Sequence, residues 1–357
     1  MSTRPRVSFD DDGRCNACIW SEKKKTFDWE KRTEQLEELL KKHRRSDGSP
    51  DCIVPVSGGK DGSYVYHQLK TRGMNPLAVT IRPALPLDVG RMNLDNFVAA
   101  GPNHLLVSPS ESAMQVLNKV GFIEMGFPYF GWLTSILVTV MNIARRFECG
   151  LIFYGEEGEV EYGGSTEVAE SPTFSIQYMK DVYLESGFEK VVDASGLSEA
   201  ELHFFRLDPR LLDGSFELDM ATWSYFENWD PYRNYLVAKE LYGLQEADST
   251  NAGTFTNFAQ NDQALYALHT YMMYLKFGFG RANQDASIEI RRGAMSRAQA
   301  VELVRLYDGQ YPKEFEATYL DYYEMSKDEF VDVLVKWTNR DLFEISGDKV
   351  IPKFTVV

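Results

Sequence analysis

The stretch "IVPVSGGKDGSYVYHQLK" (residues 53–70) constrains the fold of this 357-residue chain more than any other segment. It runs from an apolar strand through two glycines, a lysine and an aspartate into a helical pattern. A glycine-rich turn between a strand and a helix N-terminus binds anions, because free backbone N–H groups and the helix dipole point to one spot. The stretch therefore predicts a phosphate site inside an α/β fold.

The loop is not a Walker A motif. Lys60 is followed by Asp61 instead of Ser or Thr, and no glycine has the required spacing before Gly59. What remains is S-G-G-x-D at 57–61. A carboxylate beside bound phosphates repels them unless a cation lies between, and Mg²⁺ bridging Asp61 and phosphate oxygens resolves the conflict. The alternative is a simple helix N-cap preceded by a tight turn.

Strands and helices alternate after this loop. Strands are expected at 51–57, 77–81, 104–108 and 150–155, with helices at 63–73, 89–101, 112–122 and near 129–148. This order predicts a doubly wound parallel sheet with ligands beyond the carboxyl ends of its strands. The loop, residues 80–82 and residues 155–157 follow such ends.

The rest of the chain divides by pattern. Residues 160–215 give no clear element, and aromatic-rich helical segments follow at 223–243, 259–280 and 296–309. We expect an N-terminal segment with a CxxC and a helix (1–50), an α/β domain that carries the phosphate loop (51–215) and a helical substrate or partner domain (216–357).

Composition limits the partners and the location. The net charge of −15 argues against general binding to nucleic acid or membrane surfaces. The apolar stretch 130–144 is shorter than the roughly 20 residues of a membrane span, so we expect a buried helix. The first 14 residues are polar and lack a signal-peptide pattern, and four cysteines make no disulfide scaffold. These features predict a cytoplasmic protein.

Basic residues gather in "LKFGFGRANQDASIEIRRG" (275–293). Arginine flanked by glycine can approach phosphate closely and bind it in bidentate fashion, which favours Arg281 and Arg291 as phosphate or sugar-nucleotide ligands. The alternative is a solvated turn with salt bridges to Asp285 and Glu289. Lys60, within the loop itself, is expected near phosphate.

An acidic block, "GEEGEVEYGG" (155–164), follows the last expected strand. Glu156 is the candidate to orient Mg²⁺ or a ribose hydroxyl. Glu157, Glu159 and Glu161 are weaker candidates. The alternative for the block is an acidic solvent loop.

The loop resembles that of the PP-loop ATP pyrophosphatases, whose S-G-G-x-D-S motif grips the β,γ-pyrophosphate of ATP. Here Gly62 separates the aspartate from Ser63, a departure that puts the role of Ser63 in doubt. The resemblance implies ATP and Mg²⁺ as cofactors, with Asp61 on the metal. The implied ATP contacts are Val56, Ser57, Gly58, Gly59, Lys60, Asp61, Gly62, Ser63, Val79, Thr80, Ile81 and Gly155.

Further blocks, among them "FDDDGRCNACIW" and "YMMYLKFGFGRANQDASIEIRRG", are similar to the N-acetyl sugar amidotransferase family of bacterial surface-polysaccharide biosynthesis. The resemblance implies conversion of an acetamido group on a sugar or nucleotide sugar to an acetamidino group through an adenylated intermediate. Ammonia would come from a separate glutaminase subunit, with a cyclase-like barrel as a further partner. Glu156 is also the candidate to orient the incoming ammonia. The expected catalytic residues are Lys60, Asp61, Glu156, Arg281 and Arg291.

The cysteines point to no glutaminase within this chain. A glutaminase needs a cysteine activated by histidine or an N-terminal cysteine, and residue 2 is serine. Cys15 and Cys18 form half of a tetrahedral zinc site, so Zn²⁺ is a weaker expectation. His269 is kept as a weak substrate contact.

Two other functions stay open at this point. One is a tRNA sulfur-transfer enzyme on the same fold, which would require a basic surface and a cysteine persulfide or an iron–sulfur triad near the loop. Neither feature is visible in the sequence. The other is an inactive ATP-binding scaffold for a glutaminase, for which the shifted Ser63 leaves room.

Overall fold

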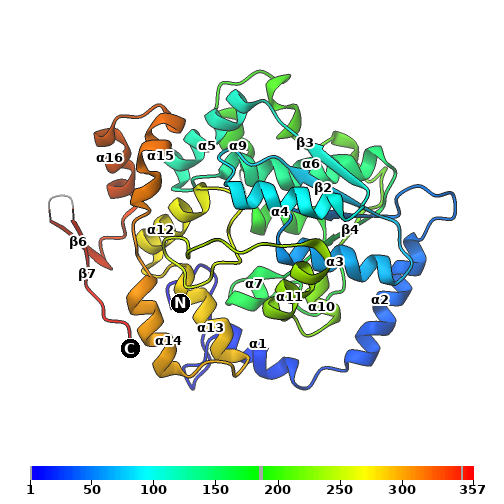
Figure 1. Cartoon of the computed structure of the whole chain (residues 1–357), viewed down its shortest axis with the longest axis horizontal. Coiled ribbons are helices and arrows are strands. Elements are labelled where there is room, and N and C mark those ends of the chain that lie inside the picture. The colour runs from blue at the N-terminus through cyan, green and yellow to red at the C-terminus, as the bar shows by residue number, and fades with distance from the viewer. Residues whose placement is uncertain (1, 185–187, 347–348) are drawn as a thin grey trace.

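The computed structural model describes residues 2–184, 188–346 and 349–357 and contains a five-stranded parallel sheet in one half of the molecule, with the C-terminal helices and a small hairpin in the other (Figure 1). The strand order is β3-β2-β1-β4-β5, and every pairing is parallel. The strands are β1 (Cys52–Pro55), β2 (Pro76–Ile81), β3 (His104–Val107), β4 (Leu151–Tyr154) and β5 (Asp219–Thr222). The expected doubly wound α/β fold is confirmed.

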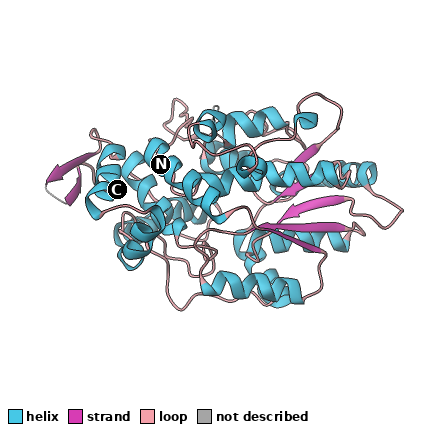
Figure 2. Ribbon diagram, turned by 90° about the horizontal axis from the view of Figure 1, so that it is seen from above, coloured by secondary structure: helices cyan, strands magenta, loops and turns pink. Residues whose placement is uncertain are grey.

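Helices cover both faces of the sheet (Figure 2). One face packs on α2 (Trp29–His43), α3 (Lys60–Thr71) and α10 (Trp223–Phe226). The other packs on α5 (Glu111–Met125) and α6 (Phe130–Arg146). Central strands buried from both sides must be apolar throughout, which explains the continuous runs in β1 and β4.

The apolar stretch at 130–144 lies in α6, where most side chains are buried against the sheet. Within the described ranges, no single helix is long and apolar enough to cross a membrane, and only the sharply bent pair α5–α6 passes that test jointly.

One strand of the sheet, β5, was not predicted from the sequence. Residues 219–222 form β5, paired with β4, where helical segments were expected to begin. The strand has four residues and Trp223 starts α10 directly after it, so no alternation develops. The region before it contains short elements: α7 (Gly158–Tyr162), α8 (Ile176–Tyr178), η1 (Met179–Tyr183), α9 (Phe188–Asp193), η2 (Glu201–Phe204) and η3 (Pro209–Leu211).

The helices after β5 share the core of the sheet. Leu268 and Met272 of α12 (Leu265–Phe277) are buried in the cluster that contains α6. The others are α11 (Pro231–Tyr242), α13 (Arg281–Arg291), α14 (Arg297–Tyr307), η4 (Lys313–Phe315), α15 (Glu316–Tyr323) and α16 (Lys327–Trp337), followed by a hairpin of β6 (Phe343–Ser346) and β7 (Lys349–Pro352). Two remaining helices, α1 (Asn16–Lys24) and α4 (Asp88–Ala99), lie earlier in the chain.

The strand order locates the binding edge. From β1 the chain moves to β2 and β3 on one side, whereas β4 and β5 lie on the other. In doubly wound sheets, ligands bind outside the carboxyl ends of the strands where the order reverses. Ser57 after β1 and Gly155 after β4 stand at that point.

Candidate functional site

Glycine is required at two positions of the loop between β1 and α3. Gly58 has a φ of +81°, and a Cβ there would lie 2.4 Å from the backbone nitrogen of Leu94 in α4. A Cβ on Gly62 would lie 2.7 Å from the carbonyl oxygen of Pro55. The first glycine lets the loop turn under α4, and the second lets α3 start directly against the end of β1.

The loop faces a cavity of about 450 Å³, here named the loop cavity, lined by Ser57, Gly59, Lys60, Asp61, Asp262 and Arg281 among others. The carboxylate of Asp61 accepts a hydrogen bond from Nδ2 of the buried Asn234 at 3.1 Å and pairs with the Lys60 ammonium. Lys60 and Arg281 thus meet two carboxylates in one space. Two cations and two carboxylates in one space have the chemistry to hold a polyphosphate together with a metal ion.

A second cavity of about 490 Å³, the sheet-edge cavity, is lined by Val56, Ile81, Leu94, Leu106 and Trp132 among others. Ser57, Asp262 and Tyr266 line both cavities, so the two adjoin. An apolar space that adjoins a charged one suits a flat base joined to phosphates.

Backbone groups at this edge are partly engaged by the protein. The hydroxyl of Thr80 donates to the Val56 carbonyl at 2.7 Å, and the Trp132 indole donates to the Ile81 carbonyl at 3.1 Å. Each carbonyl has two lone pairs, so both can accept one more hydrogen bond.

Most of the expected ATP contacts line these two cavities: Val56, Ser57, Gly59, Lys60, Asp61, Gly62, Val79, Thr80 and Ile81. Gly58 and Ser63 line neither. Ser63 is fully buried in α3, and its hydroxyl has no hydrogen-bond partner among the described residues. The extra glycine therefore turns the serine away from the cavity and places Gly62 there.

Gly155 and Glu156 connect the loop to a third space. A Cβ on Gly155 would lie 3.3 Å from that of Asp61, so the loop and the end of β4 are in contact. Glu156 lines a cavity of about 610 Å³, the charged cavity, together with Lys24, Glu161 and Arg291. Burial raises the pKa of Glu156 to about 7, with further contributions from the nearby Glu161 and Asp61 carboxylates.

The basic cluster at 275–293 is divided among separate cavities. Arg281, the first residue of α13, lines the loop cavity, and its Nε lies 2.8 Å from Asp285. Burial lowers the pKa of Arg281, but the Asp285 carboxylate more than offsets this and keeps it above its ordinary value. Arg291 lies at the other end of α13, lines the charged cavity, and donates to the Glu161 carbonyl at 2.9 Å. Arg292 pairs with Asp230 at 3.0 Å.

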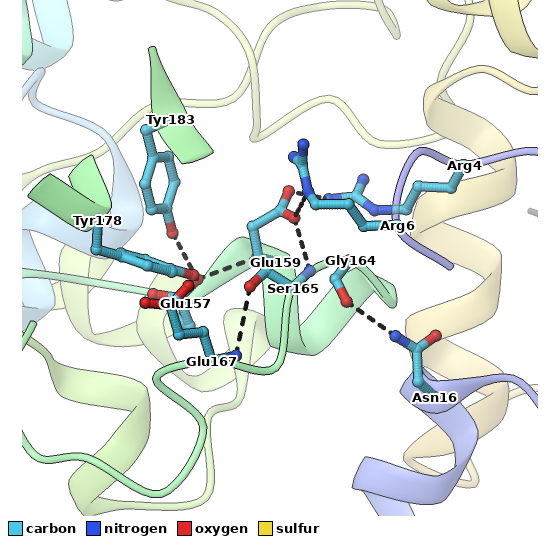
Figure 3. Close-up of polar contacts among 10 residues, drawn as sticks. All are labelled: Arg4, Arg6, Asn16, Glu157, Glu159, Gly164, Ser165, Glu167, Tyr178 and Tyr183. Carbon is cyan, nitrogen blue, oxygen red and sulfur yellow. Dashed lines mark hydrogen bonds and ion pairs between the residues drawn. The ribbon is translucent and has the colours of Figure 1, made fainter. Parts of the chain in front are cut away.

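The acidic block is a buried network, so the alternative of a solvent loop is wrong (Figure 3). Glu157 accepts a hydrogen bond from the Tyr183 hydroxyl at 2.7 Å. Glu159 pairs with Arg4 at 2.7 Å and with Arg6 at 2.9 Å, and these contacts outweigh burial and lower its pKa. The block therefore ties the N-terminal segment to the binding edge.

Glu157 predicts a pH effect on stability. Burial raises its pKa from 4.5 to about 7 despite the Tyr183 and Tyr178 hydroxyls. The folded state then binds more protons than the unfolded state between these values, so the free energy of unfolding falls as pH rises through this window and stays lower above it. Glutamine at position 157 does not titrate. We therefore expect the free energy of unfolding of Glu157→Gln, relative to that of wild type, to be about 3 kcal/mol higher at pH 8 than at pH 4.5.

Urea denaturation at both pH values measures this difference, with Glu38→Gln on the exposed face of α2 as the matched control. A difference in the free energy of unfolding between Glu157→Gln and wild type that is equal at both pH values would contradict the raised pKa of Glu157.

The cysteine pair forms no recognisable metal centre by itself. The sulfurs of Cys15 and Cys18 lie 3.5 Å apart at the start of α1, and burial raises the pKa of Cys18. Across residues 2–184, 188–346 and 349–357, no group of three or more His, Cys, Asp or Glu side chains could hold a metal ion. Cys52 lies in β1 and Cys149 just before β4, both buried.

Asp262 is a site residue that the sequence did not reveal. It lines both the loop cavity and the sheet-edge cavity, and burial raises its pKa to about 6 although the Ser57 hydroxyl opposes this. It precedes α12 in "FAQNDQALYAL", a context that resembles any helix start. Asp61 and Asp262 fit Mg²⁺, which takes one or two carboxylates and completes its shell with phosphate oxygens.

The C-terminal part of the chain matches a known family. Residues 252–354 match the model described as "LPS biosynthesis protein WbpG-like, C-terminal domain". The matched segment contains Asp262, His269 and Arg281, which line the loop cavity, and Arg291, which lines the charged cavity. This similarity supports a sugar-modifying role in polysaccharide biosynthesis. No curated protein shows significant similarity to the chain.

Proposed function

We propose that this protein is an ATP-dependent amidotransferase that converts the N-acetyl group of a sugar to an acetamidino group. The supporting observation is the apolar sheet-edge cavity joined to the charged loop cavity at the switch point of the sheet. The match of residues 252–354 to a lipopolysaccharide biosynthesis domain supports a sugar as the acceptor.

In this proposal each part of ATP and its metal ion has its own position in the two cavities. The base of ATP occupies the sheet-edge cavity, and the phosphates lie in the loop cavity beside Lys60 and Arg281. Asp61 and Asp262 would hold Mg²⁺, which neutralises phosphate charge and supports departure of pyrophosphate. Asn234 fixes the Asp61 carboxylate through its hydrogen bond at 3.1 Å. Catalysis then consists of positioning and charge stabilisation around the α-phosphate.

ATP is needed because an amide oxygen is a poor leaving group. The acetamido oxygen attacks the α-phosphorus, an O–P bond forms, and the bond to the β-phosphate oxygen breaks so that pyrophosphate leaves with the electron pair. Ammonia adds to the carbon of the O-adenylyl imidate, a proton is lost, and AMP leaves with the C–O electron pair. Glu156, with a pKa near 7, suits a base that accepts this proton.

Ammonia comes from a separate glutaminase subunit in this proposal. Burial raises the pKa of the Cys18, Cys52 and Cys149 thiols, whereas a nucleophilic cysteine needs a lowered pKa. The charged cavity with Glu156 on its wall is where we place ammonia arrival.

The decisive experiment is a product analysis with the full chain. ATP, Mg²⁺ and ammonium chloride at pH 8.5 are incubated with anionic N-acetylated sugars, and nucleotides and sugars are followed by mass spectrometry. We expect AMP, pyrophosphate and a sugar product that is one mass unit lighter, since an oxygen is replaced by an NH group. Glutamine in place of ammonium should give no product.

Each alternative has its own outcome. ADP and phosphate as products would overturn the adenylation chemistry. ATP binding without turnover of any acceptor would favour the alternative hypothesis that the chain is an inactive ATP-binding scaffold for a glutaminase. Product formation from glutamine by this chain alone would overturn the need for a separate glutaminase.

A further inference from the structure

A fourth cavity lies beside the loop cavity and is not used by the ATP site proposed above. It has a volume of about 600 Å³ and is here named the aromatic cavity. Its apolar wall includes Phe127, Phe130, Phe277 and Trp337. Its charged lining consists of the cations Arg4, Arg6 and Lys276 and the carboxylates Glu124 and Glu159, so cations exceed carboxylates. The volume is within the range of small-molecule sites in proteins.

The aromatic cavity adjoins the loop cavity through a neck. Arg4, Tyr129, His269 and Met273 line both spaces. A molecule in the aromatic cavity can therefore present one end to the space beside Lys60, Asp61 and Arg281. This is the arrangement that transfer between two bound substrates requires.

His269 gives the neck a hydrogen-bonding group. Its ring lies between Phe127 and Tyr129, with centroid distances of 4.9 and 4.8 Å. Within the described part of the chain, its Nδ1 is buried without a hydrogen-bond partner. Burial and the charges of Lys276 and Arg281 lower the pKa of His269 to about 3, so the ring is neutral and offers one donor and one acceptor.

The N-terminal segment closes one wall and holds Arg4 in place. Arg4 and Arg6 both pair with the buried Glu159, and the Thr3 hydroxyl donates to the Phe277 carbonyl (Figure 3 shows the arginines). Lys276 donates to the Met125 carbonyl at 2.8 Å and lies 5.0 Å from the centre of the Trp337 ring. Arg4 and Lys276 thus stand in fixed positions beside an aromatic wall, with Glu159 in the same lining as the partner of Arg4.

We propose that the aromatic cavity is the acceptor site and takes an N-acetylated sugar that carries a phosphate or carboxylate. The C–H face of the sugar lies on the aromatic wall, the anionic group faces Arg4 and Lys276, and the acetamido group enters the neck beside His269. This assignment rests on the proposed function, because it names where that reaction's second substrate binds.

Ligand-observed saturation-transfer NMR with the full chain tests the site without turnover. The probes are N-acetylglucosamine 1-phosphate, N-acetylneuraminic acid and, as the control without an acetyl group, glucosamine 1-phosphate. We expect saturation of the acetyl methyl signal for at least one N-acetylated probe, and the two probes distinguish phosphate from carboxylate. ATP binding is measured separately by calorimetry.

Two variants locate the binding. Leu133→Trp adds bulk at a residue that lines the aromatic cavity, and Leu306→Trp on the exposed face of α14 is its matched control. We expect only the first to abolish probe binding, with ATP affinity unchanged in both. His269→Phe keeps a ring but removes the hydrogen bond, so the N-acetylated probe should bind about tenfold more weakly while the control probe is unaffected.

The outcomes separate the two proposals. Failure of both N-acetylated probes to bind wild type, or unchanged probe binding in folded Leu133→Trp and His269→Phe, would overturn the acceptor site. Probe binding to wild type that Leu133→Trp abolishes, together with no ATP binding to wild type, would contradict the proposed function and leave only a sugar-binding site in the aromatic cavity. If Leu133→Trp fails to fold, His269→Phe alone decides.

Discussion

Asp61→Asn is expected to lower the rate of AMP formation on the order of 10²- to 10³-fold, the loss seen when one preorganised charge-stabilising group is removed. The carboxylate lies in the loop cavity, where Asn234 and Lys60 fix it, and an amide binds Mg²⁺ far more weakly. The fold should survive, because the Asp61 side chain is more than a third exposed. Calorimetry with ATP should show that Mg²⁺ no longer improves binding.

Asp88→Asn is the matched control, since Asp88 also occupies the first turn of a helix, α4, but is almost fully exposed. It tests whether the loss of any acidic residue at a helix start is sufficient to lower the rate of AMP formation. Full magnesium-dependent activity in Asp61→Asn, or an equal loss in Asp88→Asn, would contradict the metal assignment.

Gly58→Ala is expected to lower the free energy of unfolding by roughly 3 kcal/mol, the sum of a left-handed backbone cost and an overlap cost of about 1–3 kcal/mol each. The new Cβ would lie within 2.6 Å of three backbone atoms of Asn93 and Leu94, and backbone cannot move aside as a side chain can. The loop or α4 must shift, so ATP affinity should fall as well.

Gly73→Ala isolates the backbone contribution. Gly73, after α3, has a similar φ of +75°, but a Cβ there meets nothing within 4 Å. We expect Gly73→Ala to lower the free energy of unfolding by about 1 kcal/mol and to leave ATP affinity unchanged. Urea denaturation of both variants gives the comparison, and equal losses would show that contact with α4 does not constrain the loop.

The sheet could be predicted because its signal is local. Each central strand is a short apolar run followed by a helical period, and residues 53–70 carry both with a glycine turn between them. β5 could not be predicted in this way, since its four residues gain their strand geometry from pairing with β4. Long-range pairing leaves no periodic trace in so short a segment.

The candidate site could likewise be predicted only where its residues belong to a local sequence pattern. The loop residues and the strand ends converge as expected, because parallel strands deliver their carboxyl ends to one edge. Asp262 and Arg4 reach the loop cavity through tertiary packing alone, and nothing in their local sequence marks them. Arg281 and Arg291 look equivalent in sequence, yet the length of α13 sends them to different cavities.

The attachment of the N-terminal segment has a consequence for the order of folding. Arg4 and Glu159 are 155 residues apart, and Ser21 bonds to the Arg291 carbonyl across 270 residues. Closing such long loops early would cost much chain entropy for few contacts, so the segment that is synthesised first should dock last. The wall that carries Arg4 therefore forms only on a body whose sheet and C-terminal helices are already assembled. For the same reason it should be the first part to open in native-state hydrogen exchange, well below the denaturant concentration that unfolds the sheet.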